Sequence, residues 1–563
     1  MSLSRNIGRF TIGLGLLFIA LAVFIPSKTW IAAIRSIPAG METQLLLGAA
    51  FFRLGLALLG VIVFILPRLP FWRMDYQSPP LPKKHAGKAV VASMVIIILL
   101  SLFLRLYDLN DGLWIDEILT YVNYAKLPYG EIITTFESEN QHFLYSILAH
   151  TSFLLFGESA WSLRLPAVLF GVGSILALYL LGREVANERE AILSALLLTF
   201  TYYHVWFSQN ARGYSGLLFW ALLSSWFLVR GLREDRPWLW VGFAFSAALG
   251  IYTHLTMVFV VVGQFLVYLA NLYIRRRAEW RGRWSGLFLG FALAGFITFF
   301  VYAPVIPQLV GGVGKEVSVV SAWKNPIWTA LQFIQGLEIG LYGGVAAFGA
   351  LVLFGAGTWG YLRTRPAVLG LLFIPPVVGA AVVIYQGHHL WPRFFFFAFG
   401  FAVLVVIRGA MTIADWAVKL FKKVLPVSLQ RPEWIGTAFC LVLVLASILS
   451  LRRAYGPKQD YAGAKNYVEQ NFQAGDAIVV VDLTAFPYQQ YFQTGWPAVT
   501  SLDELNQIRS QANRTWLIYT FPPVLESVYP DIMQSIRSDY TEMQDFPGTV
   551  DGGAVIVCMA ESK

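Results

Sequence analysis

The sequence has 563 residues, of which 57% are hydrophobic and 13% charged, and its formal net charge is +9. An ordinary soluble protein carries about 25% charged residues, so the composition excludes that class. Apolar runs of about 20 residues recur along the chain, and each can cross about 30 Å of hydrocarbon. The sequence therefore predicts a polytopic α-helical membrane protein. Its excess of basic residues is explained by cytoplasmic loops, so we expect no nucleic-acid partner.

Two apolar runs predict two extra N-terminal transmembrane helices within residues 1–88. The first run ends at Ile25 and Pro26 without a small-residue cleavage pattern, so we expect a retained helix rather than a signal peptide. The second run contains Arg53, a charge inside a span, for which Glu42 is the candidate partner.

A membrane module is predicted over residues 89–451, which brings the total to about 13 spans. The predicted spans are 8–26, 44–66, 89–107, 164–182, 190–207, 213–231, 237–253, 256–274, 284–305, 343–362, 367–386, 393–410 and 434–451. The short apolar stretch 142–157 is not among them. If it crossed the membrane, most loops rich in Arg and Lys would lie outside, against the positive-inside rule. We therefore predict a helix that lies flat on the outer surface.

This topology places the N-terminus in the cytoplasm and the loop 108–163 outside the plasma membrane. The loop contains eight acidic residues and one basic residue, Lys126. A second long outer segment, 306–342, contains Lys315 and Glu316 and is predicted to be either a mobile lid or a passive loop.

The composition changes after about residue 452. "DAIVVVDL", "RTWLIYT" and "GGAVIVCMA" predict strands, whereas "QDYAGAKNYVEQNF" and "PVLESVYPDIMQSIRS" predict helices. Residues 452–563 are therefore predicted to form a small extracytoplasmic α/β domain, which serves either as a structural cap or for docking of an acceptor. Cys440 and Cys558 lie too far apart in this arrangement to form a disulfide.

Polar and ionisable residues gather at the predicted outer ends of the spans, where such residues are rare and usually functional. The clusters are Asp116 with Glu117; Gln209 with Arg212 and Tyr214; His254; and His388 with His389 and Arg393. Each cluster has a structural alternative: a carboxylate at a helix start, a snorkelling arginine, or a packing histidine. The paired histidines lack the spacing of a metal site, so none is predicted.

The mixture of side chains suits one kind of chemistry. A carboxylate accepts a proton from an attacking hydroxyl. Arginines hold a phosphate by charge-assisted hydrogen bonds and stabilise the charge that builds on it as it leaves. Together with interfacial aromatic residues, they indicate transfer of a sugar from a lipid phosphate to an acceptor hydroxyl.

Three motifs carry a family resemblance: "GLWIDEILTY" at 112–121, "RLP" at 164–166 and "SQNARGY" at 208–214. They are similar to motifs of polytopic GT-C fold glycosyltransferases that use polyprenyl-phosphate sugars. From about residue 89 to 410 the chain resembles the protein O-mannosyltransferase and aminoarabinose transferase superfamily, and within it the bacterial RgtA/B/C/D-like branch. The resemblance implies a polyprenyl-phosphate sugar as donor, an envelope glycan, lipid or protein as acceptor, and inversion at the anomeric carbon.

The resemblance also implies roles for individual residues. Asp116 would be the catalytic base, and Glu117 would orient the acceptor or a divalent cation. Gln209, Arg212 and Tyr214 would lie near the donor. His142 matches the histidine of a His-Pro-Pro motif whose prolines are missing here. From their position at the outer ends of the spans, His254, His388, His389 and Arg393 are added as substrate-binding residues, with Arg212 and Arg393 as candidate phosphate ligands.

Two other classes of protein remain as alternatives. A transporter or lipid flippase would place charged groups near the bilayer midplane, on broken helices related by an internal repeat. A non-catalytic envelope-assembly protein would tolerate the substitution Asp116→Asn, whereas a transferase would lose its activity.

Overall fold

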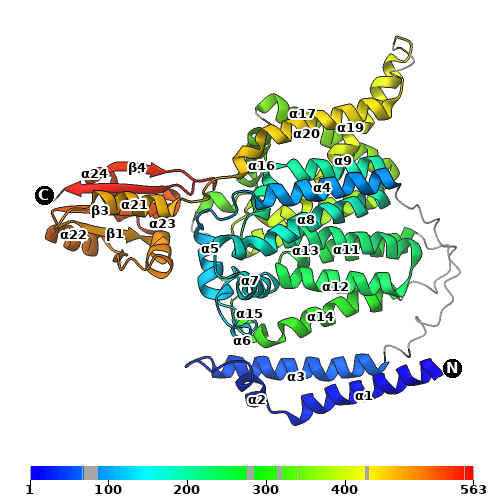
Figure 1. Ribbon diagram of the computed structural model, residues 1–563, viewed down its shortest axis with the longest axis horizontal. Helices are drawn as coiled ribbons and strands as arrows, with labels where there is room; N and C mark the ends of the chain where they lie inside the picture. Colours follow the sequence, from blue (N-terminus) through cyan, green and yellow to red (C-terminus); the bar gives the residue numbers. More distant parts are fainter. Residues whose placement is uncertain are drawn as a thin grey trace.

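The computed structural model describes residues 2–65, 68, 87–274, 285–312, 320–341, 343–424, 426, 430–550 and 552–561. A stack of side-by-side helices forms most of the molecule, and a small α/β domain projects from one end of it (Figure 1). The N-terminus lies at the opposite end of the stack. The predicted class, a multi-pass α-helical membrane protein with a small C-terminal α/β domain, is confirmed.

Each predicted span falls on a helix of the structure. Ten helices of the described chain are long and apolar enough to cross a membrane, and the pair α9–α10, bent by 65°, would make eleven. The other two predicted spans fall on α12, which has 17 residues, and on α1, whose apolar part is Phe10–Phe24. Helix α12 and the apolar part of α1 are both shorter than the usual span of about 20 residues.

The helices at the predicted spans have the following bounds: α1 Ser2–Phe24, α3 Glu42–Ile65, α4 Lys88–Leu106, α8 Ala160–Val185, α9 Glu188–Phe200, α10 Tyr202–Ser208, α11 Tyr214–Glu234, α12 Pro237–Thr253, α13 Met257–Ile274, η5 Gly286–Ala292, α14 Leu293–Tyr302, η6 Ala303–Val305, α17 Gly344–Thr364, α18 Pro366–Gln386, η8 Pro392–Ala398, α19 Phe399–Phe421 and α20 Pro432–Ser450. Part of the Arg- and Lys-rich loops on which the predicted topology rests, including the basic residues at 73, 83–84 and 275–277, lies outside the described residues.

The N-terminal helices α1 and α3 pack against each other beside α14. The predicted pair of Arg53 with Glu42 is wrong. Arg53 instead donates hydrogen bonds to the carbonyl oxygens of Ala22 and Val23, at 2.7 and 3.1 Å. Glu42 pairs with Lys28. The last carbonyls of a helix have no partner within the helix, so the end of α1 offers acceptors to the guanidinium.

Short helices gather at the end of the stack that carries the α/β domain. They are α5 (Ile115–Thr120), η3 (Tyr121–Ala125), α6 (Tyr129–Ile132) and α7 (Phe143–Phe156). Helix α7 is seen nearly end-on in Figure 1, so it runs across the direction of the long helices, as the surface-helix prediction requires.

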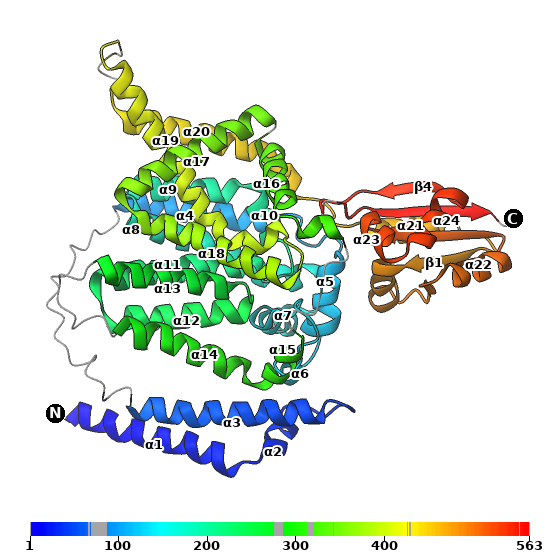
Figure 2. The ribbon, with the colours of Figure 1, turned by 180° about the vertical axis from the view of Figure 1, so that it is seen from behind.

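The segment predicted as a lid or loop contains the helices α15 (Ile306–Gly312), η7 (Ser321–Lys324) and α16 (Pro326–Leu341). Seen from behind, α16 lies at the end of the stack that carries the α/β domain (Figure 2). The predicted lid residues Lys315 and Glu316 lie outside the described residues.

The C-terminal domain is built on a sheet of order β2-β1-β3-β5-β4. Strands β2, β1 and β3 are parallel, β5 runs antiparallel to β3, and β4 runs antiparallel to β5. The strands are β1 Ala477–Val481, β2 Ala498–Val499, β3 Arg514–Thr520, β4 Thr541–Phe546 and β5 Val555–Glu561; the helices are α21 Tyr461–Asn471, α22 Leu502–Gln511, α23 Pro522–Val528 and α24 Pro530–Asp539. The prediction missed β4 because this edge strand is polar and almost entirely exposed. Cys440 and Cys558 are unpaired, as expected.

Candidate active site

Asp116 opens onto a cavity of about 1430 Å³ at the end of the helix stack. Seven of the ten residues predicted for the site line this cavity: Asp116, Arg212, Tyr214, His254, His388, His389 and Arg393. They come from α5, from the start of α11, from the turn between α12 and α13, and from the segment around the start of η8. The fold therefore brings pieces of chain that are up to 277 residues apart (393 − 116) to one place.

Two arginines face the carboxylate of Asp116. Its Oδ2 atom lies 3.9 Å from Nε of Arg212 and 3.8 Å from Nη1 of Arg393. These distances are too long for hydrogen bonds, so the carboxylate keeps its lone pairs free. Nε of Arg212 and Nε of Arg393 are both buried, and neither has a hydrogen-bond partner among the described residues. The site thus combines a free proton acceptor with unused cationic donors.

Each arginine is held in place by its neighbours. Arg212 donates from Nη1 to the carbonyl oxygen of Asn140 at 3.2 Å, and its guanidinium lies 5.8 Å from the ring centre of Tyr214. The guanidinium of Arg393 lies 5.0 Å from the ring centre of Trp391. These contacts leave part of each guanidinium available to an anion in the cavity.

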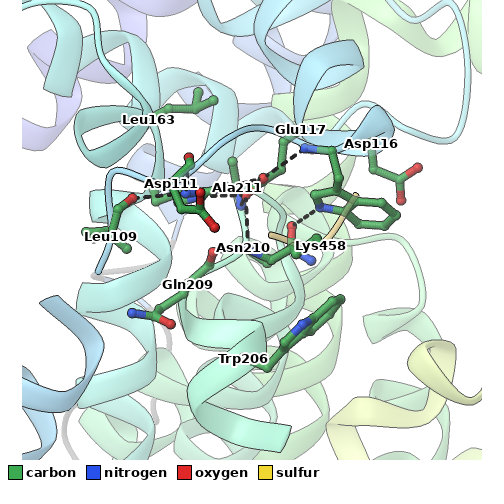
Figure 3. Close-up of polar contacts among 12 residues, drawn as sticks. Leu109, Asp111, Asp116, Glu117, Leu163, Trp206, Gln209, Asn210, Ala211 and Lys458 are labelled. Atoms are coloured by element: carbon green, nitrogen blue, oxygen red, sulfur yellow. Dashed lines mark hydrogen bonds and ion pairs between the residues drawn. The ribbon is translucent and has the colours of Figure 1, made fainter. Parts of the chain in front are cut away.

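Glu117 is fully buried and does not line the cavity, and Figure 3 shows Asp116 standing apart from the hydrogen-bonded network around Glu117. The carboxylate of Glu117 accepts two hydrogen bonds from Arg164, at 2.8 and 2.6 Å, and one from the backbone N–H of Ala211 at 2.7 Å. Burial alone would raise the pKa of Glu117, but the charges of Arg164 and Lys458 and these hydrogen bonds hold it below its usual value. Glu117 therefore fixes the segment before Arg212 and does not reach the cavity, contrary to its expected place beside the substrate.

Gln209 and His142 also lie behind the cavity wall. The amide of Gln209 donates to the carbonyl oxygens of Arg105 and Tyr107, which ties the segment to the end of α4. The ring of His142 is buried, with its centre 4.6 Å from that of His254. Burial, and then the charges of Arg212 and Arg393, lower the pKa of His254 to about 3, so its ring is neutral at physiological pH.

The segment around α16 covers one side of the cavity. Trp323, Gln332, Gln335 and Glu338 line it. The carbonyl oxygen of Trp323 accepts a hydrogen bond from the backbone N–H of Leu390 at 2.9 Å, and its ring lies 4.7 Å from that of Trp391. The predicted lid segment is therefore docked on the loop that carries His388 and His389.

The C-terminal domain supplies another wall of the cavity. Leu483, Phe521, Val524, Thr549 and Val550 line it. Nε1 of Trp206 donates to Oγ1 of Thr549 at 2.8 Å, which joins α10 to the domain. These residues were not predicted as part of the site, because a folded domain carries no local sequence signal of the surface that it will cover.

The residues around Asp116 do not suit a divalent cation. Among the described residues no group of at least three His, Cys, Asp or Glu side chains could hold a metal ion. Two guanidinium groups already lie within 3.9 Å of the carboxylate and would repel a metal cation. The divalent cation that the family resemblance allows beside Glu117 thus finds no suitable set of ligands among the described residues.

Residues 141–302 match the family model of the dolichyl-phosphate-mannose-protein mannosyltransferases. This match supports the predicted resemblance to the GT-C glycosyltransferases. It includes Arg164, Gln209, Arg212, Tyr214 and His254 and ends before the segment with Arg393.

The chain is also 25% identical to two mannosyltransferase candidates of Bacillus subtilis (strain 168). The match to YkcB extends over 205 residues, and that to YycA over 195 residues. They cover 33% and 31% of this chain and 27% of each relative, so the chain matches about a quarter of the length of these proteins.

Two solved structures are similar over most of the chain. ArnT from Cupriavidus metallidurans, bound to undecaprenyl phosphate, is 14% identical with a TM-score of 0.47, over 84% of this chain and 98% of that one. The Archaeoglobus fulgidus oligosaccharyltransferase tethered to an acceptor peptide is 13% identical with a TM-score of 0.46, over 84% of this chain and 74% of that one.

Proposed function

We propose that this protein is a membrane glycosyltransferase that moves a sugar from a polyprenyl phosphate to a hydroxyl group of an envelope glycan, lipid or protein. One observation carries the proposal. The carboxylate of Asp116 lies in a cavity of about 1430 Å³, within 3.9 Å of two arginines that have unused buried donors. The family match over residues 141–302 supports the same assignment.

In the proposed reaction, Asp116 accepts the proton of the acceptor hydroxyl as its oxygen attacks the anomeric carbon. A bond forms from that oxygen to the anomeric carbon while the bond from the carbon to the phosphate oxygen breaks. The bonding electrons leave with the polyprenyl phosphate. Because attack and departure occur on opposite faces of the sugar, the configuration inverts.

Arg212 and Arg393 are proposed to hold the phosphate. The leaving phosphate gains negative charge in the transition state, and preorganised cationic donors in a shielded site stabilise such charge strongly. The neutral ring of His254 lines the same cavity and can donate or accept a hydrogen bond without adding charge.

We further propose that the cavity faces the outside of a bacterial plasma membrane. Helices α8, α11, α17 and α19 all run away from the cavity end, and their last turns carry Arg183, Arg233, Arg363 and Lys419. The positive-inside rule assigns that end to the cytoplasm. Gln534 is exposed on α24, so a cysteine placed there should react with a membrane-impermeant maleimide in intact cells. Labelling only after the cells are opened would refute this orientation.

The activity is tested with the purified full-length protein in lipid nanodiscs. It is incubated with radiolabelled polyprenyl-phosphate hexoses and pentoses in turn, together with an envelope extract as acceptor. We expect release of free polyprenyl phosphate and transfer of label with at least one donor. A transporter without transferase activity would move the lipid across a bilayer and leave the sugar–phosphate bond intact.

A further inference from the structure

The linker between the last membrane helix and the C-terminal domain is held by that domain along its backbone. The N–H of Thr549 donates to the carbonyl oxygen of Pro457 at 3.0 Å, and that of Val550 to the carbonyl oxygen of Lys458 at 3.1 Å. Gly548 approaches so closely that an added Cβ atom would lie 2.0 Å from the carbonyl oxygen of Lys458. The position of Lys458 therefore depends on a docked domain.

The side chain of Lys458 extends toward Gln209 and Glu117, which lie behind the wall of the cavity. It is 6% exposed, and its Nζ donates to the carbonyl oxygen of Gln209 at 2.8 Å. Nζ also lies 3.9 Å from Oε1 of Glu117 and 5.6 Å from the ring centre of Trp206. Burial, and then the charge of Arg164, lower the pKa of Lys458 to about 7, so the lysine is held at an energetic cost.

Gln459 makes a second connection of the same kind. Its Oε1 accepts a hydrogen bond from the backbone N–H of Ile115 at 3.2 Å. Ile115 is the first residue of α5, and its N–H has no partner within that helix. Nε2 of Gln459 donates to Thr520 and to the carbonyl oxygen of Gly553, both in the C-terminal domain. One side chain thus bridges the domain and the helix that carries Asp116.

These contacts complete the support of the segment before Arg212. Lys458 holds the carbonyl oxygen of Gln209, Nε1 of Trp114 donates to Oδ1 of Asn210, and Glu117 holds the N–H of Ala211. Figure 3 shows Lys458 beside this segment, close to Asn210 and Trp206. Hydrogen bonds therefore hold each of the three residues 209–211, which directly precede Arg212.

We propose that Lys458 and Gln459 are positioning residues, through which the docked C-terminal domain fixes Arg212 and the start of α5 in the geometry that the transferase needs. The domain is then an integral part of the active site rather than an accessory cap. This inference rests on the proposed function for its meaning, but its structural part can be measured without substrate.

The test compares full-length Lys458→Met, Lys458→Arg and Lys465→Met with the wild-type protein. Lys465 lies in the same domain and pairs with Glu469, so Lys465→Met is a matched control that leaves the linker untouched. The first readout is hydrogen exchange of the peptide that contains Ala211 and Arg212. The second is the division of any activity change between kcat and the KM for the donor.

We expect Lys458→Met to exchange faster at Ala211 and to lose about tenfold in kcat, the effect of one lost hydrogen bond from a charged group. Lys458→Arg should recover part of both, and Lys465→Met should match the wild type. If Lys458 only tethered the C-terminal domain, Lys458→Met would loosen the docking of the domain without changing kcat in the folded protein. Exchange and kcat within about twofold of wild type in Lys458→Met would overturn the inference.

A second variant covers the case in which Lys458→Met does not fold. Gly548→Ala displaces the backbone of Lys458 without changing the chemistry of its side chain, so the ammonium group should shift from the carbonyl oxygen of Gln209 and the same peptide should loosen. Unchanged exchange in Gly548→Ala would contradict the inference. If the wild type transfers no sugar, the proposed function fails, whereas the exchange data still decide whether Lys458 positions Arg212.

Discussion

The two faces of α5 show how neighbouring carboxylates acquire opposite tasks. Asp116 lies on the cavity face, partly exposed, and its nearest cations are 3.8 and 3.9 Å away. Glu117 lies on the buried face with no exposed surface and is 2.6 Å from Arg164. Successive residues of a helix point about 100° apart, which is enough to put one carboxylate in the cavity and the next in the core.

The difference teaches that charge alone does not make a catalytic residue. Glu117 accepts two hydrogen bonds from Arg164 and one each from the backbone N–H groups of Ala211 and Trp114, which occupy the roughly four lone-pair sites of its carboxylate. The carboxylate of Asp116 has two arginines close by but beyond hydrogen-bond distance, so it can still accept a proton from a substrate.

The largest effect is expected for Asp116→Asn. Removing the general base should lower kcat about 10²- to 10⁴-fold, while the unfolding temperature stays within error of wild type. Donor binding should not weaken, because the substitution removes a negative charge next to the phosphate site. Turnover and thermal unfolding of the same preparation measure both. A folded Asp116→Asn protein with wild-type turnover would end the assignment.

Glu117→Gln should act mainly on stability. It leaves Arg164 buried without its counter-ion, and breaking a buried pair costs about 3–5 kcal/mol. We expect a lower unfolding temperature and a lower yield of folded protein. If Glu117→Gln unfolds like the wild type but has no activity, Glu117 acts on the substrate and the contrast between the two faces is lost.

Arg212→Met and Arg393→Met should weaken donor binding. Each removes a charged donor that faces the cavity, so the Kd for polyprenyl phosphate should rise about ten- to a hundredfold. Arg365→Met, an exposed substitution after α17, is the matched control. Equal affinities in all three variants would place the phosphate elsewhere.

The smallest effect concerns acid stability. The folded-state pKa of His254 is about 3, so below pH 6.5 the unfolded chain binds a proton that the folded protein does not. Stability therefore falls as the pH drops from about 6.5, by about 1 kcal/mol at pH 5.5 from this residue. Thermal unfolding at pH 7.5 and 5.5 should show a smaller acid-induced shift in His254→Gln than in wild type. An identical shift would show that burial and the charges of Arg212 and Arg393 do not hold His254 neutral in the folded protein.

Much of the membrane fold could be predicted from hydropathy, because each span needs a continuous apolar run. The gathering of Asp116, Arg212 and Arg393 followed from assigning their loops to one side of the membrane. The inward direction of Glu117 could not be predicted, because its partner Arg164 is 47 residues away and adjacency in sequence does not reveal direction. Lys458 was missed for a related reason: a single lysine in a linker has no pattern until the domain docks.

The most direct test of the account is a structure of the protein with a polyprenyl phosphate bound. We predict phosphate oxygens within about 3.5 Å of the guanidinium groups of Arg212 and Arg393, with the terminal phosphate oxygen, to which the sugar is attached in the donor, directed toward Asp116. A phosphate bound away from both arginines, or a lipid that enters from the opposite end of the helix stack, would contradict it.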